Sequence, residues 1–223
     1  MSDLRLVIFD VDGTISDSQG DIVASMSRAF EKAGLPAPVR ETVLGIVGLS
    51  LDVAIPRLAP GLAPTAHATM VADYKDAYLQ LRTAPGAVAS PLYPGIEDAI
   101  AELAADPLTV LGIATGKSMR GLIALLDGHG FGPHFVTRQT ADLHPSKPDP
   151  AMLLAACAET GIAPDRAVMI GDTSFDMDMA KAAGMKAIGV TWGYHDTGAL
   201  SAADLTVDDA GDLPGAVRRL LPD

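Results

Sequence analysis

The chain has 223 residues, 48% of them hydrophobic, which suffices for a large buried core and excludes general disorder. Its 16 Lys and Arg against 28 Asp and Glu give a net charge of −12. An acidic surface repels a phosphate backbone, so we expect no nucleic acid partner. The single cysteine, Cys157, excludes an internal disulfide and a cysteine-based metal site, and we expect it in the core.

The sequence contains no apolar run that approaches the roughly 18–20 residues of a membrane span. Its first residues lack the charged and apolar regions of a secretory signal. We therefore expect no membrane partner and a cytoplasmic location, while the oligomeric state stays open.

Short apolar runs of strand length alternate with helical patterns along most of the chain. Nearly every position in these runs is apolar, which is typical of strands covered by helices on both faces of a sheet. The alternation predicts an α/β fold with a Rossmann-like parallel sheet. The predicted strands are residues 4–9, 109–114, 135–137, 167–170, 187–191 and 205–207.

Two helical patterns flank a long insertion. Apolar spacing over residues 22–33 predicts a helix that stops at Gly34, and a pattern that starts at Pro94 predicts another over 96–103. Residues 16–84 show helical spacing without strands, although a crossover between parallel strands needs only one helix. We therefore expect a core of residues 1–15 and 85–223, and a helical cap of residues 16–84 hinged near 15–17 and 85–86.

Polar residues follow several of the predicted strands, where open parallel sheets bind their ligands. Asp10 and Asp12 follow the first strand, Thr115 the second and Asp172 the fourth, and Lys147 adds a cation. Crowded carboxylates repel one another unless a cation or protons neutralise them, and oxygen ligands favour Mg²⁺ over zinc. The set predicts a magnesium site that binds an anion, with phosphate as the natural candidate.

Four segments carry a resemblance to a known family. Residues 9–14 (Phe-Asp-Val-Asp-Gly-Thr), 114–117 (Ala-Thr-Gly-Lys), 146–150 (Ser-Lys-Pro-Asp-Pro) and 170–176 (Ile-Gly-Asp-Thr-Ser-Phe-Asp) resemble, in order, the four motifs of the haloacid dehalogenase superfamily. The insertion and the segments 17–18, 93–95 and 190–194 resemble the phosphoglycolate phosphatase-like branch, which has a helical C1-type cap. The resemblance implies a Mg²⁺-dependent phosphatase for a small phosphorylated metabolite, with 2-phosphoglycolate as the lead substrate.

In such an enzyme each residue has an expected role. Asp10 would attack phosphorus to form an aspartyl-phosphate, and Asp12 would protonate the leaving oxygen and then activate water. Thr115, Gly116 and Lys147 would bind the phosphate oxygens. Gly13 would permit a tight turn, and Asp176 would position the metal through a water or a hydrogen bond to Lys147. The expected Mg²⁺ ligands are Asp10, Asp12 and Asp172.

Other residues near the motifs have less specific expectations. We expect Lys117 to be a solvated helix residue, and Trp192 and Tyr194 to be packing residues. The carboxylate of phosphoglycolate would need a cationic or amide-rich contact from the cap. The candidates are Arg28, Lys32, Arg40, Arg57, Lys75, Arg82 and the backbone of residues 45–50.

Several alternatives share these motifs. A dehalogenase needs no second aspartate, because halide leaves without a proton, so Asp12 favours phosphoryl transfer. A phosphomutase, or a phosphatase for a sugar phosphate, nucleotide or pyrophosphate, remains open. A receiver-type phospho-acceptor domain is disfavoured, because its acid pair precedes a phosphorylated aspartate on a later strand.

Overall fold

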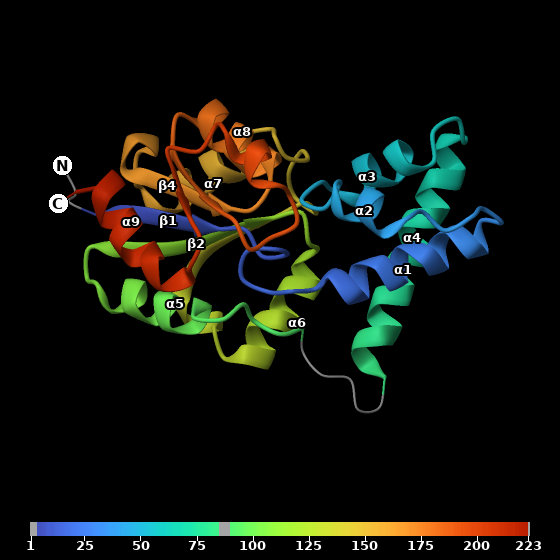
Figure 1. The fold of residues 1–223 in the computed structure, drawn as a ribbon, viewed down its shortest axis with the longest axis horizontal. Coiled ribbons are helices and arrows are strands. Elements are labelled where there is room, and N and C mark those ends of the chain that lie inside the picture. The colour runs from blue at the N-terminus through green and yellow to red at the C-terminus, as the bar shows by residue number, and fades with distance from the viewer. Residues whose placement is uncertain (1–3, 85–89, 223) are drawn as a thin grey trace.

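A computed structural model describes residues 4–84 and 90–222, and it contains one parallel sheet in the order β3-β2-β1-β4-β5-β6 (Figure 1). All six predicted strands form, which confirms the α/β prediction. The main difference is the third strand, which extends to Thr140 because Thr137 and Gln139 are buried. The strands are β1 (Arg5–Phe9), β2 (Thr109–Thr115), β3 (Phe135–Thr140), β4 (Ala167–Gly171), β5 (Lys186–Val190) and β6 (Leu205–Val207).

Helices cover both faces of this sheet, which explains why β1 is apolar at successive positions. Val7 and Phe9 belong to one hydrophobic cluster, with residues of α5 (Ile96–Ala105), α6 (Met119–His129) and α9 (Leu213–Leu220). Leu6 and Ile8 point to the opposite face, where they pack with α7 (Ala151–Thr160) and α8 (Ser174–Ala183). Cys157 lies in this second cluster, so its predicted place in the core is confirmed. Short 3-10 turns occupy Gly132–His134, Pro164–Arg166, Thr197–Leu200 and Ala210–Asp212.

The insertion forms four helices that pack mainly on one another, beyond the carboxyl ends of the strands (Figure 1). Met26, Phe30, Ile55 and Met70 are buried in a cluster of their own there. We call these helices the helical lobe: α1 (Gln19–Lys32), α2 (Arg40–Leu44), α3 (Leu51–Leu58) and α4 (Pro64–Thr83). The hinge predicted at 85–86 lies outside the described residues, and within them no helix has the length and apolar character needed to cross a membrane.

The strand order reverses beside β1. The chain places β2 and β3 on one side of β1, and β4, β5 and β6 on the other. In open parallel sheets the crevice at such a switch point, outside the carboxyl ends of the strands, is where ligands bind. Asp10 directly follows β1 and therefore lies at that crevice.

The burial of two isoleucines predicts how much each contributes to the free energy of unfolding. Ile100 on α5 is fully buried against the sheet, whereas Ile123 on α6 is 41% exposed. We expect Ile100→Ala to lower the free energy of unfolding by about 2–5 kcal/mol, and Ile123→Ala to change it by about 0.5 kcal/mol or less. Urea unfolding of both variants checks this, and equal losses would contradict the assigned packing.

Candidate active site

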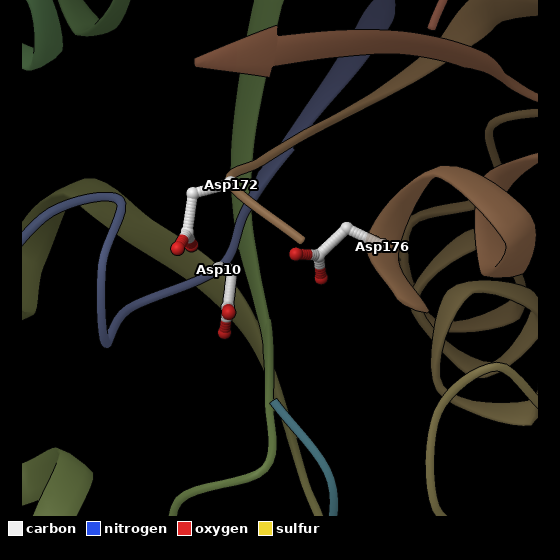
Figure 2. A group of neighbouring side chains, drawn as sticks. All are labelled: Asp10, Asp172 and Asp176. Atoms are coloured by element: carbon white, nitrogen blue, oxygen red, sulfur yellow. The ribbon is translucent and has the colours of Figure 1, made fainter. Parts of the chain in front are cut away.

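Three carboxylates gather at the carboxyl end of the central strands (Figure 2). Asp10 follows β1, Asp172 follows β4, and Asp176 lies in the first turn of α8. One oxygen of each lies within 4.8 Å of the others, and all three residues are fully buried. The Lys147 ammonium joins them, with Nζ 2.9 Å from Asp10 Oδ1 and 2.6 Å from Asp176 Oδ1. Three buried negative groups thus share this positive one.

Hydroxyl and backbone donors fix two of these carboxylates, whereas the third has only the Lys147 ammonium. The Thr14 hydroxyl donates to Asp172 Oδ1 at 2.9 Å, and the Tyr194 amide donates to Asp172 Oδ2 at 2.8 Å. Thr173 donates its hydroxyl to Asp176 Oδ2 at 2.7 Å and forms a capping box with it at the start of α8. The Asp10 carboxylate receives no hydroxyl or backbone donor from the described residues, and its polar contact among them is the Lys147 ammonium at Oδ1. Such a group is costly unless a ligand completes it.

Burial dominates the protonation of this cluster. It raises the pKa of Asp10 to about 7, although the charge of Lys147 counteracts part of the rise. Burial likewise raises the pKa of Asp172 well above its ordinary value, and Asp176 adds repulsion. A divalent cation would restore the charged forms, and oxygen donors of this kind suit Mg²⁺. The residues therefore fit the metal that the motifs predict.

Asp12 lies apart from this cluster. The Ser18 hydroxyl donates to its Oδ1 at 2.5 Å, and Lys117 Nζ lies 2.7 and 3.0 Å from its two oxygens. Its carboxylate is therefore engaged elsewhere, and Asp176 is the third member of the acidic cluster in place of the expected Asp12 side chain. The same geometry places Asp176 in the expected hydrogen bond to Lys147.

Lys117 is not the solvated helix residue that the sequence indicated. Its side chain is only 7% exposed, and its ammonium donates to Asp12 and, at 3.1 Å, to the Tyr78 hydroxyl of α4. Burial is the largest influence on Lys117 and lowers its pKa, but the charge of Asp12 and the interactions with Tyr78 together outweigh burial and raise the pKa overall. The sequence could not show that Lys117 is buried, because Lys117 lies in the turn after β2 and the residues that bury it belong to the helical lobe.

Trp192 and Tyr194 do more than pack. Trp192 Nε1 donates to the Thr14 carbonyl at 3.2 Å. The Tyr194 hydroxyl accepts from the Ser18 amide at 3.0 Å and lies 3.3 Å from the Ser18 hydroxyl. These contacts hold the loop that follows β1. Tyr194 thereby fixes Ser18, whose hydroxyl donates to Asp12. The signal available in the sequence was that buried Tyr and Trp side chains usually need a polar partner.

The backbone of three glycines lies in close contact with the side chains of Asp172 and Asp176. A Cβ on Gly13, whose φ is +93°, would lie 2.2 Å from Asp172 Oδ2. A Cβ on Gly193 would lie 2.1 Å from the Asp172 Cβ, and one on Gly171 would lie 2.4 Å from the Asp176 Cγ. Gly13 therefore serves the tight turn expected of it and also leaves room for Asp172.

A cavity of about 620 Å³ opens between this end of the sheet and the helical lobe. Asp10, Asp12, Thr115, Gly116 and Lys117 contribute to its wall on the sheet side. The opposite wall comes from α1, α4 and the segment that leads into α3. The structure thus brings the predicted reactive and phosphate-binding residues to one cavity, with Lys147 paired to Asp10.

Comparisons with known proteins agree with this architecture. The family model described as haloacid dehalogenase-like hydrolase matches residues 7–190. A protein of Dickeya dadantii named probable phosphatase IndB is 36% identical, over 97% of this chain and 94% of its own length. The phosphoglycolate phosphatase of Pseudomonas putida is 32% identical, over 98% of this chain and 79% of its own.

Solved structures share the fold at lower identity. A predicted phosphatase from Clostridium acetobutylicum superposes with a TM-score of 0.85 at 24% identity, covering 97% of this chain and 99% of that one. The β-phosphoglucomutase of Clostridium difficile gives 0.84 at 19% identity, covering 98% and 97%. The chain belongs to the haloacid dehalogenase-like hydrolase family, which confirms the predicted family. The relatives also support the predicted enzyme class, a phosphoric monoester hydrolase.

The glycine contacts allow a matched test of how tightly the site is built. Gly34→Ala introduces a side chain at a φ of +72° with open space around it, so we expect a loss of about 1–2 kcal/mol of stability. Gly13→Ala adds the collision with Asp172 to a similar backbone cost. We expect a clearly larger loss for Gly13→Ala in chemical unfolding, and equal losses would contradict the close approach.

Proposed function

We propose that this protein is a Mg²⁺-dependent phosphatase that hydrolyses a small phosphate monoester through a phosphorylated Asp10. The observation that carries the proposal is Asp10 itself, which is buried, contacts the Lys147 ammonium, receives no hydroxyl or backbone donor at its carboxylate from the described residues, and lies at the wall of a cavity it shares with Asp12. A nucleophile and a separate proton-transfer group at one cavity are the minimum for this reaction.

The proposed reaction has two displacements at phosphorus. An Asp10 oxygen forms a bond to phosphorus while the ester P–O bond breaks, and Asp12 gives a proton to the departing alkoxide. Water then attacks the aspartyl-phosphate and Asp12 takes its proton, so the bond to Asp10 breaks and inorganic phosphate leaves. Asp12 is assigned this part because it contributes to the same cavity wall as Asp10 while its carboxylate lies outside the acidic cluster.

Asp10 and Asp172 are the proposed metal-binding side chains, and Lys147 orients Asp176 beside them. Bound Mg²⁺ supplies positive charge that offsets repulsion between these carboxylates and a dianionic phosphate. Thr115, Gly116 and Lys147 are the proposed contacts to the phosphate oxygens, since charge stabilisation must do most of the catalysis of such slow reactions.

The sequence relatives favour 2-phosphoglycolate as a substrate to test. Its carboxylate needs a partner from the helical lobe. Of the six basic residues considered from the sequence, Lys75 and Arg82 contribute to the cavity wall. Lys75 Nζ lies 3.7 Å from Asp142, and Arg82 lies 3.2 Å from Asp21, so both already face a carboxylate.

A phosphomutase is the second candidate reaction. The structural likeness to a β-phosphoglucomutase carries the fold alone. Release of inorganic phosphate, with no accumulation of an isomeric phosphate ester, separates the phosphatase from the mutase.

Asp10→Asn tests the nucleophile. We expect it to lower turnover of any phosphate monoester substrate by more than ~10³-fold, because the amide cannot form the phosphorylated intermediate. Asp98→Asn, at an exposed position on α5, is the control and should retain turnover. Phosphate release measures both variants, and substantial activity in Asp10→Asn would exclude Asp10 as the nucleophile.

Mg²⁺ binding has a readout independent of turnover. At 100 times its dissociation constant, Mg²⁺ should stabilise the fold by about 2.7 kcal/mol, measured as a rise in Tm. Asp172→Asn should abolish most of that rise because it removes an anionic ligand, while the amide keeps the shape of the buried side chain and lets the metal-free protein fold. An undiminished rise in this variant would place the metal elsewhere.

A further inference from the structure

The cavity wall that faces the reactive aspartates is largely apolar. From the helical lobe it receives Ile22 and Met26 of α1 together with Val71, Tyr74, Tyr78 and Leu79 of α4. The Tyr74 and Tyr78 rings stack on each other, with centroids 6.2 Å apart and planes 23° from parallel. This wall therefore offers apolar area and aromatic surface to whatever is attached to the phosphate.

Cations in the same cavity are already engaged. Lys117 is bound to Asp12, Lys75 faces Asp142, and Arg82 faces Asp21. Arg120 also contributes to the wall, but it is exposed, so water solvates its charge. A carboxylate on the substrate would have to compete with an aspartate for any of the three paired cations.

The cavity is also larger than a two-carbon substrate needs. About 620 Å³ lies within the roughly 300–1,000 Å³ range of pockets that enclose drug-sized molecules. A two-carbon acid phosphate would leave most of the apolar wall in contact with water. Burying an apolar group against that wall would strengthen binding in proportion to the apolar area removed from water.

We propose that the preferred substrates are phosphate monoesters whose alcohol carries an uncharged apolar ring, which packs against Tyr74, Leu79 and their neighbours while the phosphate lies at Asp10. This assignment rests on the proposed phosphatase function and replaces 2-phosphoglycolate as the expected best substrate. The Tyr74–Tyr78 pair gives the ring an aromatic surface, and a carboxylate would have to compete with an aspartate for Lys75, Arg82 or Lys117.

The test compares primary alkyl phosphates of similar leaving-group chemistry. The ratio of kcat/KM for 2-phenylethyl phosphate to that for ethyl phosphate isolates the contribution of the ring, and 2-phosphoglycolate is assayed beside them. We expect 2-phenylethyl phosphate to exceed both of the others at least tenfold.

Two wall variants and one control locate the effect. Leu79 is 37% exposed, so Leu79→Asn should fold normally, and Tyr74→Leu keeps an apolar side chain while removing the ring. We expect each to reduce the ratio of kcat/KM for 2-phenylethyl phosphate to that for ethyl phosphate at least threefold. Leu154→Asn makes the same change as Leu79→Asn at another exposed leucine, on α7, and should alter neither rate.

The outcomes separate this inference from the proposed function. Hydrolysis of all three esters with a ratio near one, or with 2-phosphoglycolate the fastest, would overturn the ring preference and leave the phosphatase intact. An unchanged ring advantage in both wall variants would also overturn it. Loss of 2-phosphoglycolate turnover in Arg120→Gln, with ethyl phosphate unaffected, would instead assign carboxylate recognition to Arg120. Hydrolysis of no phosphate ester in the presence of Mg²⁺ would refute the phosphatase itself.

Discussion

The imbalance of charge around Asp10 is the constraint on which the rest of the site depends. Asp10, Asp172 and Asp176 are fully buried, and Lys147 supplies one positive charge to the three of them. Coulomb repulsion is strong where water is excluded, so such a cluster persists only if the surrounding fold holds it in place. Backbone and hydroxyl donors do this for Asp172 and Asp176, while Asp10 is left to interact with an incoming ligand.

The fold and the acidic cluster were largely predictable because their signals are local. Strands buried on both faces are apolar at successive positions, and residues that follow parallel strands meet at one edge of a sheet. Asp10 and Asp172 could be brought together on that basis, whereas Lys147, in the loop between β3 and α7, was added from its own sequence segment. Asp176 could be anticipated because a helix that begins just after β4 returns its first turn to the same edge.

The support around Asp12 was not predictable, because it depends on how the helical lobe lies against the sheet. Lys117 meets Tyr78 across that boundary, and Ser18 meets Tyr194 from the far end of the chain. No spacing within one segment encodes such a meeting. Lys117 and Ser18 hold the Asp12 carboxylate outside the acidic cluster, and the expectation that Asp12 helps to bind the metal stays a prediction.

The acidic cluster and the cavity wall from the helical lobe are built differently, and this affects which substitutions the protein can accept. Around Asp172 and Asp176, the peptide backbone of Gly13, Gly171 and Gly193 leaves no room for even a methyl group, so few sequences can preserve the cluster. The wall from the helical lobe is built of side chains, several of them partly exposed, and replacing one leaves the acidic cluster untouched. Mutational drift can therefore explore new leaving groups while the phosphoryl chemistry stays the same, and the architecture is suited to descendants that share a reaction and differ in their substrates.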